Sequence, residues 1–104
     1  MTLAVEFSAE AADEVEEAML WYENRRDGLG SAFLDSVDEA ISDVAMWPQS
    51  GAMVQGLSHL AVRRLSIGRF PYHLAYIQSD NSIHILAVAH DKRQPGYWAS
   101  RRPN

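Results

Sequence analysis

The sequence predicts an α+β fold in which two helices cover one face of an antiparallel sheet. Between Ser8 and Pro48, apolar residues recur at helical spacing in two stretches that a glycine-containing turn separates. Between Ala61 and His90, three runs place apolar residues at every second position, as in strands. A shorter alternating run precedes the helices. The expected order is β-α-α-β-β-β: an N-terminal strand, an antiparallel helical hairpin and a three-stranded antiparallel meander, followed by a short C-terminal turn or helix.

The first strand and the first helix follow from local patterns. Leu3, Val5 and Phe7 occupy alternate positions, which is typical of a strand with one buried face. Ser8 can cap the helix, because its side-chain oxygen can accept a hydrogen bond from a free N–H group of the first turn. The apolar stripe of this helix is formed by Ala11, Val15, Ala18 and Tyr22, with Met19 beside it.

The second helix begins after a turn at Asp27-Gly28-Leu29-Gly30, where Gly28 is expected to be left-handed. Pro48 ends this helix, because proline lacks the N–H group that helix continuation needs. The connection is so short that the two helices must be antiparallel. The stripe of the second helix is formed by Phe33, Val37, Ile41 and Val44, with Leu34, Ala40 and Ala45 alongside.

The meander begins with a strand over residues 61–67, whose apolar parity shifts across Arg63-Arg64, so a β-bulge is expected there. A tight connection leads to the second strand, and Asp80 and Asn81 can both adopt the left-handed geometry of the next hairpin turn. The third strand, ending at His90, has apolar residues on both faces and should therefore be central. One face of the second strand is formed by Phe70, Tyr72, Leu74 and Tyr76. With the N-terminal strand, the sheet is expected to have four strands.

Composition limits the class of protein. With 104 residues, of which 47% are apolar, we expect one domain over residues 1–104. The sequence has no cysteine, and its four histidines show no ligand spacing, so no metal and no cofactor are expected. It has neither a signal-peptide pattern nor a membrane-length apolar run. We therefore expect a cytoplasmic protein without membrane contact.

Charge is distributed unevenly along the chain. Residues 1–50 hold 12 Asp and Glu and two Arg, a net charge of −10, whereas residues 51–104 hold two Asp and seven Lys and Arg, a net charge of +5, which together give the overall −5. Either one half faces a charged partner, or the two halves partly neutralise each other. The net negative charge argues against bare electrostatic binding to DNA, and no direct sequence-specific DNA binding is expected.

Five short motifs, in their order along the chain, carry a resemblance to a known family. They are Trp21-Tyr22, Gly28 to Gly30, Val62 to Leu65, Phe70 to Tyr72, and Ala87 to Trp98 with the sequence AVAHDKRQPGYW. Together they resemble the RelE/ParE superfamily of toxins, and the resemblance covers nearly the whole chain. It implies the toxin of a type II toxin–antitoxin module, which a cognate antitoxin neutralises.

The resemblance implies two possible targets. ParE-like members inhibit DNA gyrase, and RelE-like members cut mRNA in the ribosome. The C-terminal motif from His90 to Trp98 is more similar to the ParE-like members. The chain also has only one lysine, Lys92, and so lacks the lysine-rich second strand of several ribosome-dependent nucleases. The sequence therefore favours a gyrase inhibitor, with a ribosome-dependent endoribonuclease as the alternative.

The nuclease alternative assigns roles to specific side chains. RNA cleavage through the 2′-hydroxyl needs a base, an acid and cations around the phosphate. His90 could serve as acid or base and Tyr97 could assist, while cations could come from Arg63, Arg64 and Arg69. Neither Asp80 nor Asp91, the only carboxylates of this half, is placed as a dedicated base.

The inhibitor hypothesis assigns the contact surface to the basic C-terminal edge. Its candidate residues are Arg69, Lys92, Arg93, Tyr97, Trp98, Arg101 and Arg102. Structural roles account for several of the same residues. His90 could be a hydrogen-bonded residue at a strand end, and Tyr97 and Trp98 could pack the C-terminal turn onto the sheet. Arg63, Arg64 and Arg69 could pair with the acidic helices.

Overall fold

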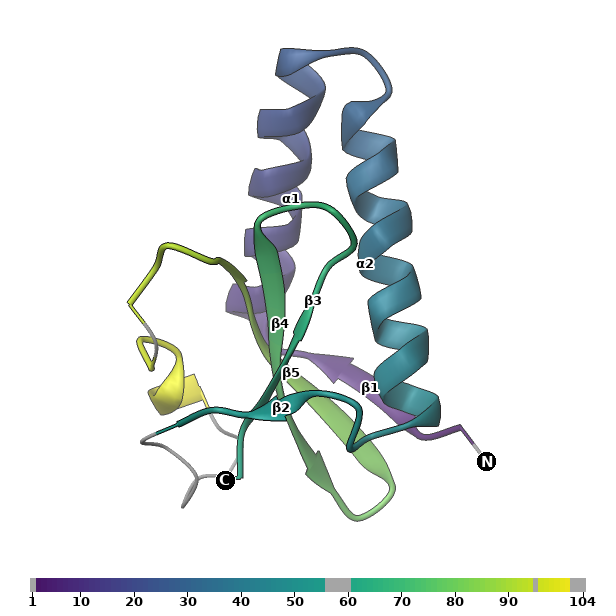
Figure 1. Ribbon diagram of the computed structural model, residues 1–104, viewed down its shortest axis with the longest axis vertical. Coiled ribbons are helices and arrows are strands. Elements are labelled where there is room, and N and C mark those ends of the chain that lie inside the picture. The colour runs from purple at the N-terminus through teal and green to yellow at the C-terminus, as the bar shows by residue number, and fades with distance from the viewer. Residues whose placement is uncertain (1, 56–60, 95, 102–104) are drawn as a thin grey trace.

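The fold combines a helical hairpin with one mixed sheet (Figure 1). A computed structural model describes residues 2–55, 61–94 and 96–101. The element order confirms the predicted α+β class and the sequence β-α-α-β-β-β, with an additional two-residue strand after the second helix. Within the described ranges, no helix is long and apolar enough to cross a membrane.

Strand β1 (Ala4–Phe7) leads directly into helix α1 (Ala9–Arg25). The expected cap is confirmed, because the Ser8 hydroxyl oxygen accepts a hydrogen bond from the backbone N–H of Ala11 at 3.0 Å. Ala11, Ala18 and Tyr22 are buried on the inner face of the helix, as the apolar stripe predicts.

Helix α2 (Leu29–Met46) runs antiparallel to α1 (Figure 1). Gly28 is left-handed, with φ 87°, as predicted. Gly30 allows the two helices to approach closely: a Cβ atom at this position would lie 2.8 Å from the carbonyl oxygen of Met19.

The sheet has the strand order β1-β5-β4-β3-β2. The meander strands β3 (Arg63–Ser66), β4 (Tyr72–Ser79) and β5 (Ser82–His90) pair antiparallel, and β1 pairs parallel with β5. β5 is therefore central, as predicted. The expected four strands become five, because β2 (Ala52–Met53) pairs with β3.

The expected bulge at Arg63-Arg64 is wrong. β3 pairs with β4 in continuous register, from Arg63 opposite Tyr76 to Ser66 opposite His73. The irregularity lies in β5, where Ala87 faces Ala75 but Ile85 faces Tyr76, which leaves Leu86 as the extra residue. The apolar parity shifts near Arg63-Arg64 because Val62 and Leu65 pack on opposite faces of the sheet, and both faces carry a core.

The larger core lies between the helices and the sheet. It unites Tyr22 and Phe33 of the hairpin with Leu74, Tyr76 and Ile85 of the sheet. A smaller core covers the opposite face, where Trp98, just before the 3-10 helix η2 (Ala99–Arg101), packs against apolar residues of the sheet and of neighbouring loops: Val54, Val62, Ala75, Ile77, Leu86 and Ala87.

Candidate functional site

Arg63 and Arg64 are consecutive in β3 and therefore point to opposite faces of the sheet. Arg63 shares the helix-covered face with Tyr76, and its Nη1 donates a hydrogen bond to the carbonyl oxygen of Gly51 at 2.8 Å. Arg64 lies on the other face, with Nη2 3.7 Å from Oδ1 of Asp91. The two guanidinium groups cannot surround one phosphate in this arrangement. Among the salt bridges of the described residues, none joins either arginine to a helix carboxylate, so the expected pairing with the acidic helices is wrong for these two residues.

Asp91 also holds a buried histidine. Its Oδ1 lies 2.9 Å from Nδ1 of His73, whose exposed fraction is 6%. Burial lowers the pKa of His73 below its ordinary value, although the hydrogen bond to Asp91 acts in the opposite direction. His73 is therefore a neutral imidazole near pH 7 that donates Nδ1–H to Asp91.

His90 ends β5 on the helix-covered face. The backbone N–H of Lys92 donates to its Nδ1 at 3.1 Å, so the neutral ring carries its proton on Nε2. The ring packs edge-on against Tyr72, with 5.1 Å between the ring centroids. It lines a hollow of about 150 Å³, whose walls also include Trp21 and Arg93. His90 is thus a hydrogen-bonded residue at a strand end, at the margin of a shallow hollow.

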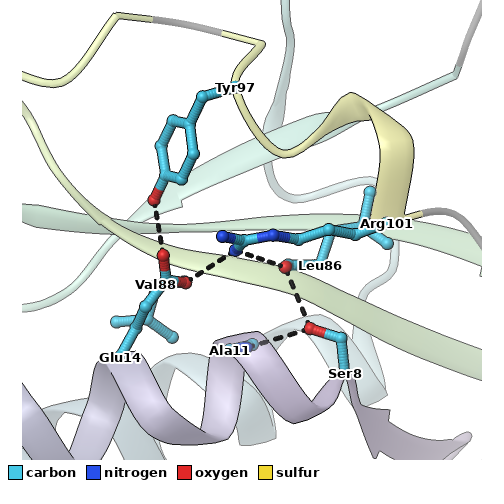
Figure 2. Close-up of polar contacts among 7 residues, drawn as sticks. All are labelled: Ser8, Ala11, Glu14, Leu86, Val88, Tyr97 and Arg101. Carbon is cyan, nitrogen blue, oxygen red and sulfur yellow. Dashed lines mark hydrogen bonds and ion pairs between the residues drawn. The ribbon is translucent and has the colours of Figure 1, made fainter.

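Tyr97 and Arg101 converge on one carboxylate that the sequence reasoning did not select (Figure 2). The Tyr97 hydroxyl donates to Oε2 of Glu14 at 2.8 Å, and Nη1 of Arg101 donates to Oε1 at 3.0 Å. The backbone N–H of Val88 donates to the same Oε1 at 3.0 Å. Burial, followed by the bond to Glu14 and its charge, raises the pKa of Tyr97 to about 12. Its phenol is therefore a poor base at neutral pH.

Glu14 could have been found from its helical position. It lies three residues after Ala11 and four before Ala18, on the face of α1 that turns inward. An acidic residue on an inward face needs donors, because a buried carboxylate without them is costly. The sequence pattern indicates this need, but it does not identify the donors, which come from β5 and the C-terminal segment.

The remaining C-terminal candidates divide into buried and exposed residues. Trp98 has an exposed fraction of 2%, so its side chain packs into the smaller core and is not available on the surface. Arg69, Lys92 and Arg93 are exposed. The guanidinium carbon of Arg93 lies 3.9 Å from the centre of the Tyr97 ring. Arg102 lies outside the described residues.

The structure thus brings together Arg93, Tyr97 and Arg101, with Glu14 at the centre of the group. His90 lines the same hollow as Glu14, Arg93 and Tyr97. Arg63 lines a different hollow, together with Pro48 and Met53, and Arg64 is on the face opposite to Arg63. The five residues of the nuclease alternative do not form one constellation.

Comparison with known proteins agrees with this fold. A solved structure described as "Chromosomal ParDE TA system from P. aeruginosa" matches with a TM-score of 0.66 and 17% sequence identity, covering 86% of this chain and 96% of that chain. At that identity the match shows a shared fold. No curated protein matches the chain. The family model described as "ParE toxin of type II toxin-antitoxin system, parDE" matches residues 5–95. This match spans most of the chain and confirms the resemblance seen in the sequence: the chain belongs to the ParE toxin family of type II toxin–antitoxin systems.

Proposed function

We propose that this toxin-family chain inhibits DNA gyrase by docking and that a cognate antitoxin neutralises it. The observation that carries the proposal is the arrangement around Glu14, combined with membership in the ParE family. Polar side chains at the C-terminal edge are engaged with one another in hydrogen bonds and ion pairs. Such an arrangement suits a rigid binding surface better than an acid–base centre.

The chemistry of the individual side chains supports docking over cleavage. RNA cleavage would need a proton acceptor beside the 2′-hydroxyl and cations around one phosphate. The carboxylate of Glu14 accepts hydrogen bonds from three donors, and burial together with the bond to Glu14 raises the pKa of Tyr97 to about 12. Arg63 and Arg64 occupy opposite faces of the sheet.

The docking surface that we propose is the basic edge formed by Arg69, Lys92 and Arg93, which are all exposed. These cations lie outside the ion pairs of Arg64 and Arg101. They would meet an acidic surface of the target, because opposite potentials speed encounter and fix orientation. The antitoxin would neutralise the toxin by covering this edge or by blocking the approach to it.

Expression of the chain without its partner tests the proposal. It should stop growth, the purified protein should inhibit gyrase supercoiling, and co-expression with the partner should restore growth. Unchanged supercoiling, together with mRNA cuts at codon-defined positions in a translating extract, would contradict the proposal and favour the endoribonuclease that acts on mRNA in the ribosome. In that case His90→Ala should reduce cleavage by orders of magnitude without unfolding the protein, roughly the 10²- to 10⁴-fold that a general acid or base supplies.

A further inference from the structure

Glu14 differs from its acidic neighbours in the first half of helix α1. Glu10, Asp13, Glu16 and Glu17 are exposed, whereas the Glu14 side chain is 18% exposed and points toward β5 (Figure 2). Its two oxygens accept hydrogen bonds from one backbone and two side-chain donors. A carboxylate with this many donors is fixed in position.

The need for Glu14 arises from the unequal lengths of two strands. β1 ends at Phe7, opposite Ile85, but β5 continues to His90. Beyond this point, no strand of the described residues pairs with this edge of β5, so its polar backbone groups need other partners. The carbonyl oxygen of Leu86 accepts hydrogen bonds from the Ser8 hydroxyl and from the Arg101 guanidinium group. The backbone N–H of Val88 donates a hydrogen bond to the Glu14 carboxylate. Where β1 ends, side chains therefore replace a neighbouring strand as hydrogen-bond partners of the β5 backbone.

The same carboxylate connects this edge to the C-terminal segment, residues 96–101. Glu14 binds the Tyr97 hydroxyl through one oxygen and Arg101 through the other. The Tyr97 ring in turn carries the guanidinium group of Arg93 at 3.9 Å. A continuous chain of contacts thus runs from a carboxylate on α1, through a tyrosine ring, to an exposed cation.

We infer that Glu14 is a positioning residue: it holds Tyr97 and, through the Tyr97 ring, places Arg93 for contact with the target, without touching the target itself. The inference rests on the proposed docking function. It also makes a claim that is independent of the target's identity, namely that Glu14 fixes the C-terminal segment. The two parts call for separate measurements.

Glu14→Gln is the decisive change, because it keeps the shape of the side chain but removes the charge that pairs with Arg101 and one of the two oxygens that accept hydrogen bonds. Glu16→Gln is the matched control, an exposed glutamate two residues along the same helix. Hydrogen exchange at the backbone of residues 96–101 should become faster in Glu14→Gln, while exchange in α2 and β4 stays as in the wild type. Tyrosine absorbance should show one ionisation moving from a pKa of about 12 toward the ordinary value of 10.0, and Tyr97→Phe identifies that ionisation.

Activity is then measured as growth arrest in cells and as gyrase inhibition. Glu14→Gln should raise the concentration for half-inhibition roughly tenfold, as expected when a charge-assisted hydrogen bond is lost, and Glu16→Gln should not. If Glu14 acts through Arg93, the effect of Glu14→Gln should largely disappear in an Arg93→Ala background.

The possible outcomes separate the inference from the proposed function. If the wild-type protein arrests growth but leaves gyrase unaffected, the proposed target is wrong. The growth arrest caused by Glu14→Gln, by Arg93→Ala and by the double variant then tests whether Glu14 acts through Arg93. Unchanged exchange in residues 96–101 of Glu14→Gln would overturn the inference. So would full activity in a folded Glu14→Gln protein, or an effect that adds completely to that of Arg93→Ala.

Discussion

At the scale of single residues, buried side chains supply hydrogen bonds that strand pairing leaves out. The Tyr76 hydroxyl, in a side chain that is 1% exposed, donates to the Pro48 carbonyl oxygen at 2.8 Å and accepts from the Gly51 N–H at 2.9 Å. This one hydroxyl fixes the chain between α2 and β2. The role of Glu14 at the edge of β5 is similar, because both groups bond backbone atoms far away in the sequence.

Tyr76→Phe removes the hydroxyl and leaves Gly51 N–H and Pro48 carbonyl without their partner. Leaving a buried polar group unpaired costs about 1–3 kcal/mol, so we expect the free energy of unfolding to fall by that amount. Urea denaturation followed by circular dichroism measures the change. Tyr72→Phe is the control, because the Tyr72 side chain is only half-buried, and an equal loss in both variants would contradict the role assigned to the Tyr76 hydroxyl.

His73 makes the stability of the fold depend on pH. Its pKa is lowered in the folded protein, so at mildly acidic pH the unfolded chain binds a proton that the folded chain does not. The free energy of unfolding should therefore decrease as the pH falls through 6.5, the ordinary pKa of histidine, and stop decreasing once the folded pKa is passed.

The measurement is urea denaturation at a series of pH values between about 5 and 8, the range in which histidine titrates. His73→Gln should lose part of the pH dependence that the wild type shows. His84→Gln is the control, because it leaves His73 in place. An identical pH dependence in the wild type and His73→Gln would contradict the prediction.

At the scale of elements, the sequence predicted what local periodicity determines. The helical hairpin was predictable from its apolar stripes, from Ser8 and from the left-handed Gly28. The meander was predictable from its alternation and from its turn, where Asp80 has φ 50°. Strand β2 was not, because two residues show no period and pair only through contact with β3.

The bulge and the contacts of Glu14 were also hard to predict from the sequence, because both depend on pairing between distant segments. The apolar parity shift at Arg63-Arg64 is not a bulge, whereas the bulge at Leu86 lies within the unbroken apolar run of residues 85–89, so only the pairing of β4 with β5 locates it. The sequence singled out Tyr97 and Arg101 as candidate contact residues, and the structure brings both to Glu14. The sequence could not identify Glu14 as their partner, 83 and 87 positions away, because that contact exists only after α1 packs against β5.

Trp98 tests how the C-terminal segment is attached to the second face of the sheet. Its side chain is 2% exposed and fills the smaller core. Trp98→Ala should lower the free energy of unfolding by about 3–5 kcal/mol, as is typical for a buried aromatic residue. Trp47→Ala, at a position that is 66% exposed, should change it by less than about 0.5 kcal/mol. Similar losses in the two variants would contradict the packing role of Trp98.

At the scale of the whole molecule, charge is separated in space as well as in sequence. Helices α1 and α2 carry eight exposed carboxylates: Glu10, Asp13, Glu16, Glu17, Asp35, Asp38, Glu39 and Asp43. The C-terminal half presents the basic edge defined above. Among the salt bridges of the described residues, one involves a carboxylate of these helices, namely the pair of Arg101 with Glu14. Glu6 of β1 and His84 of β5 form a second contact between the halves, at 3.1 Å, but the exposed carboxylates of the helices and the cations of the basic edge lie apart from both contacts.

This separation predicts that the position of a charge matters more than its number. Arg93→Glu on the basic edge and Arg26→Glu in the turn between α1 and α2 change the net charge by the same amount. Arg93→Glu should strongly raise the concentration for half-inhibition of gyrase, because the new carboxylate would be repelled by the acidic surface of the target. Arg26→Glu should leave that concentration unchanged. Inhibition of gyrase by the wild-type protein should also weaken as the salt concentration rises toward 1 M, where the electrostatic screening length falls to about 3 Å. Equal effects of the two variants would show that net charge alone governs inhibition, and the basic edge would then have no role in docking.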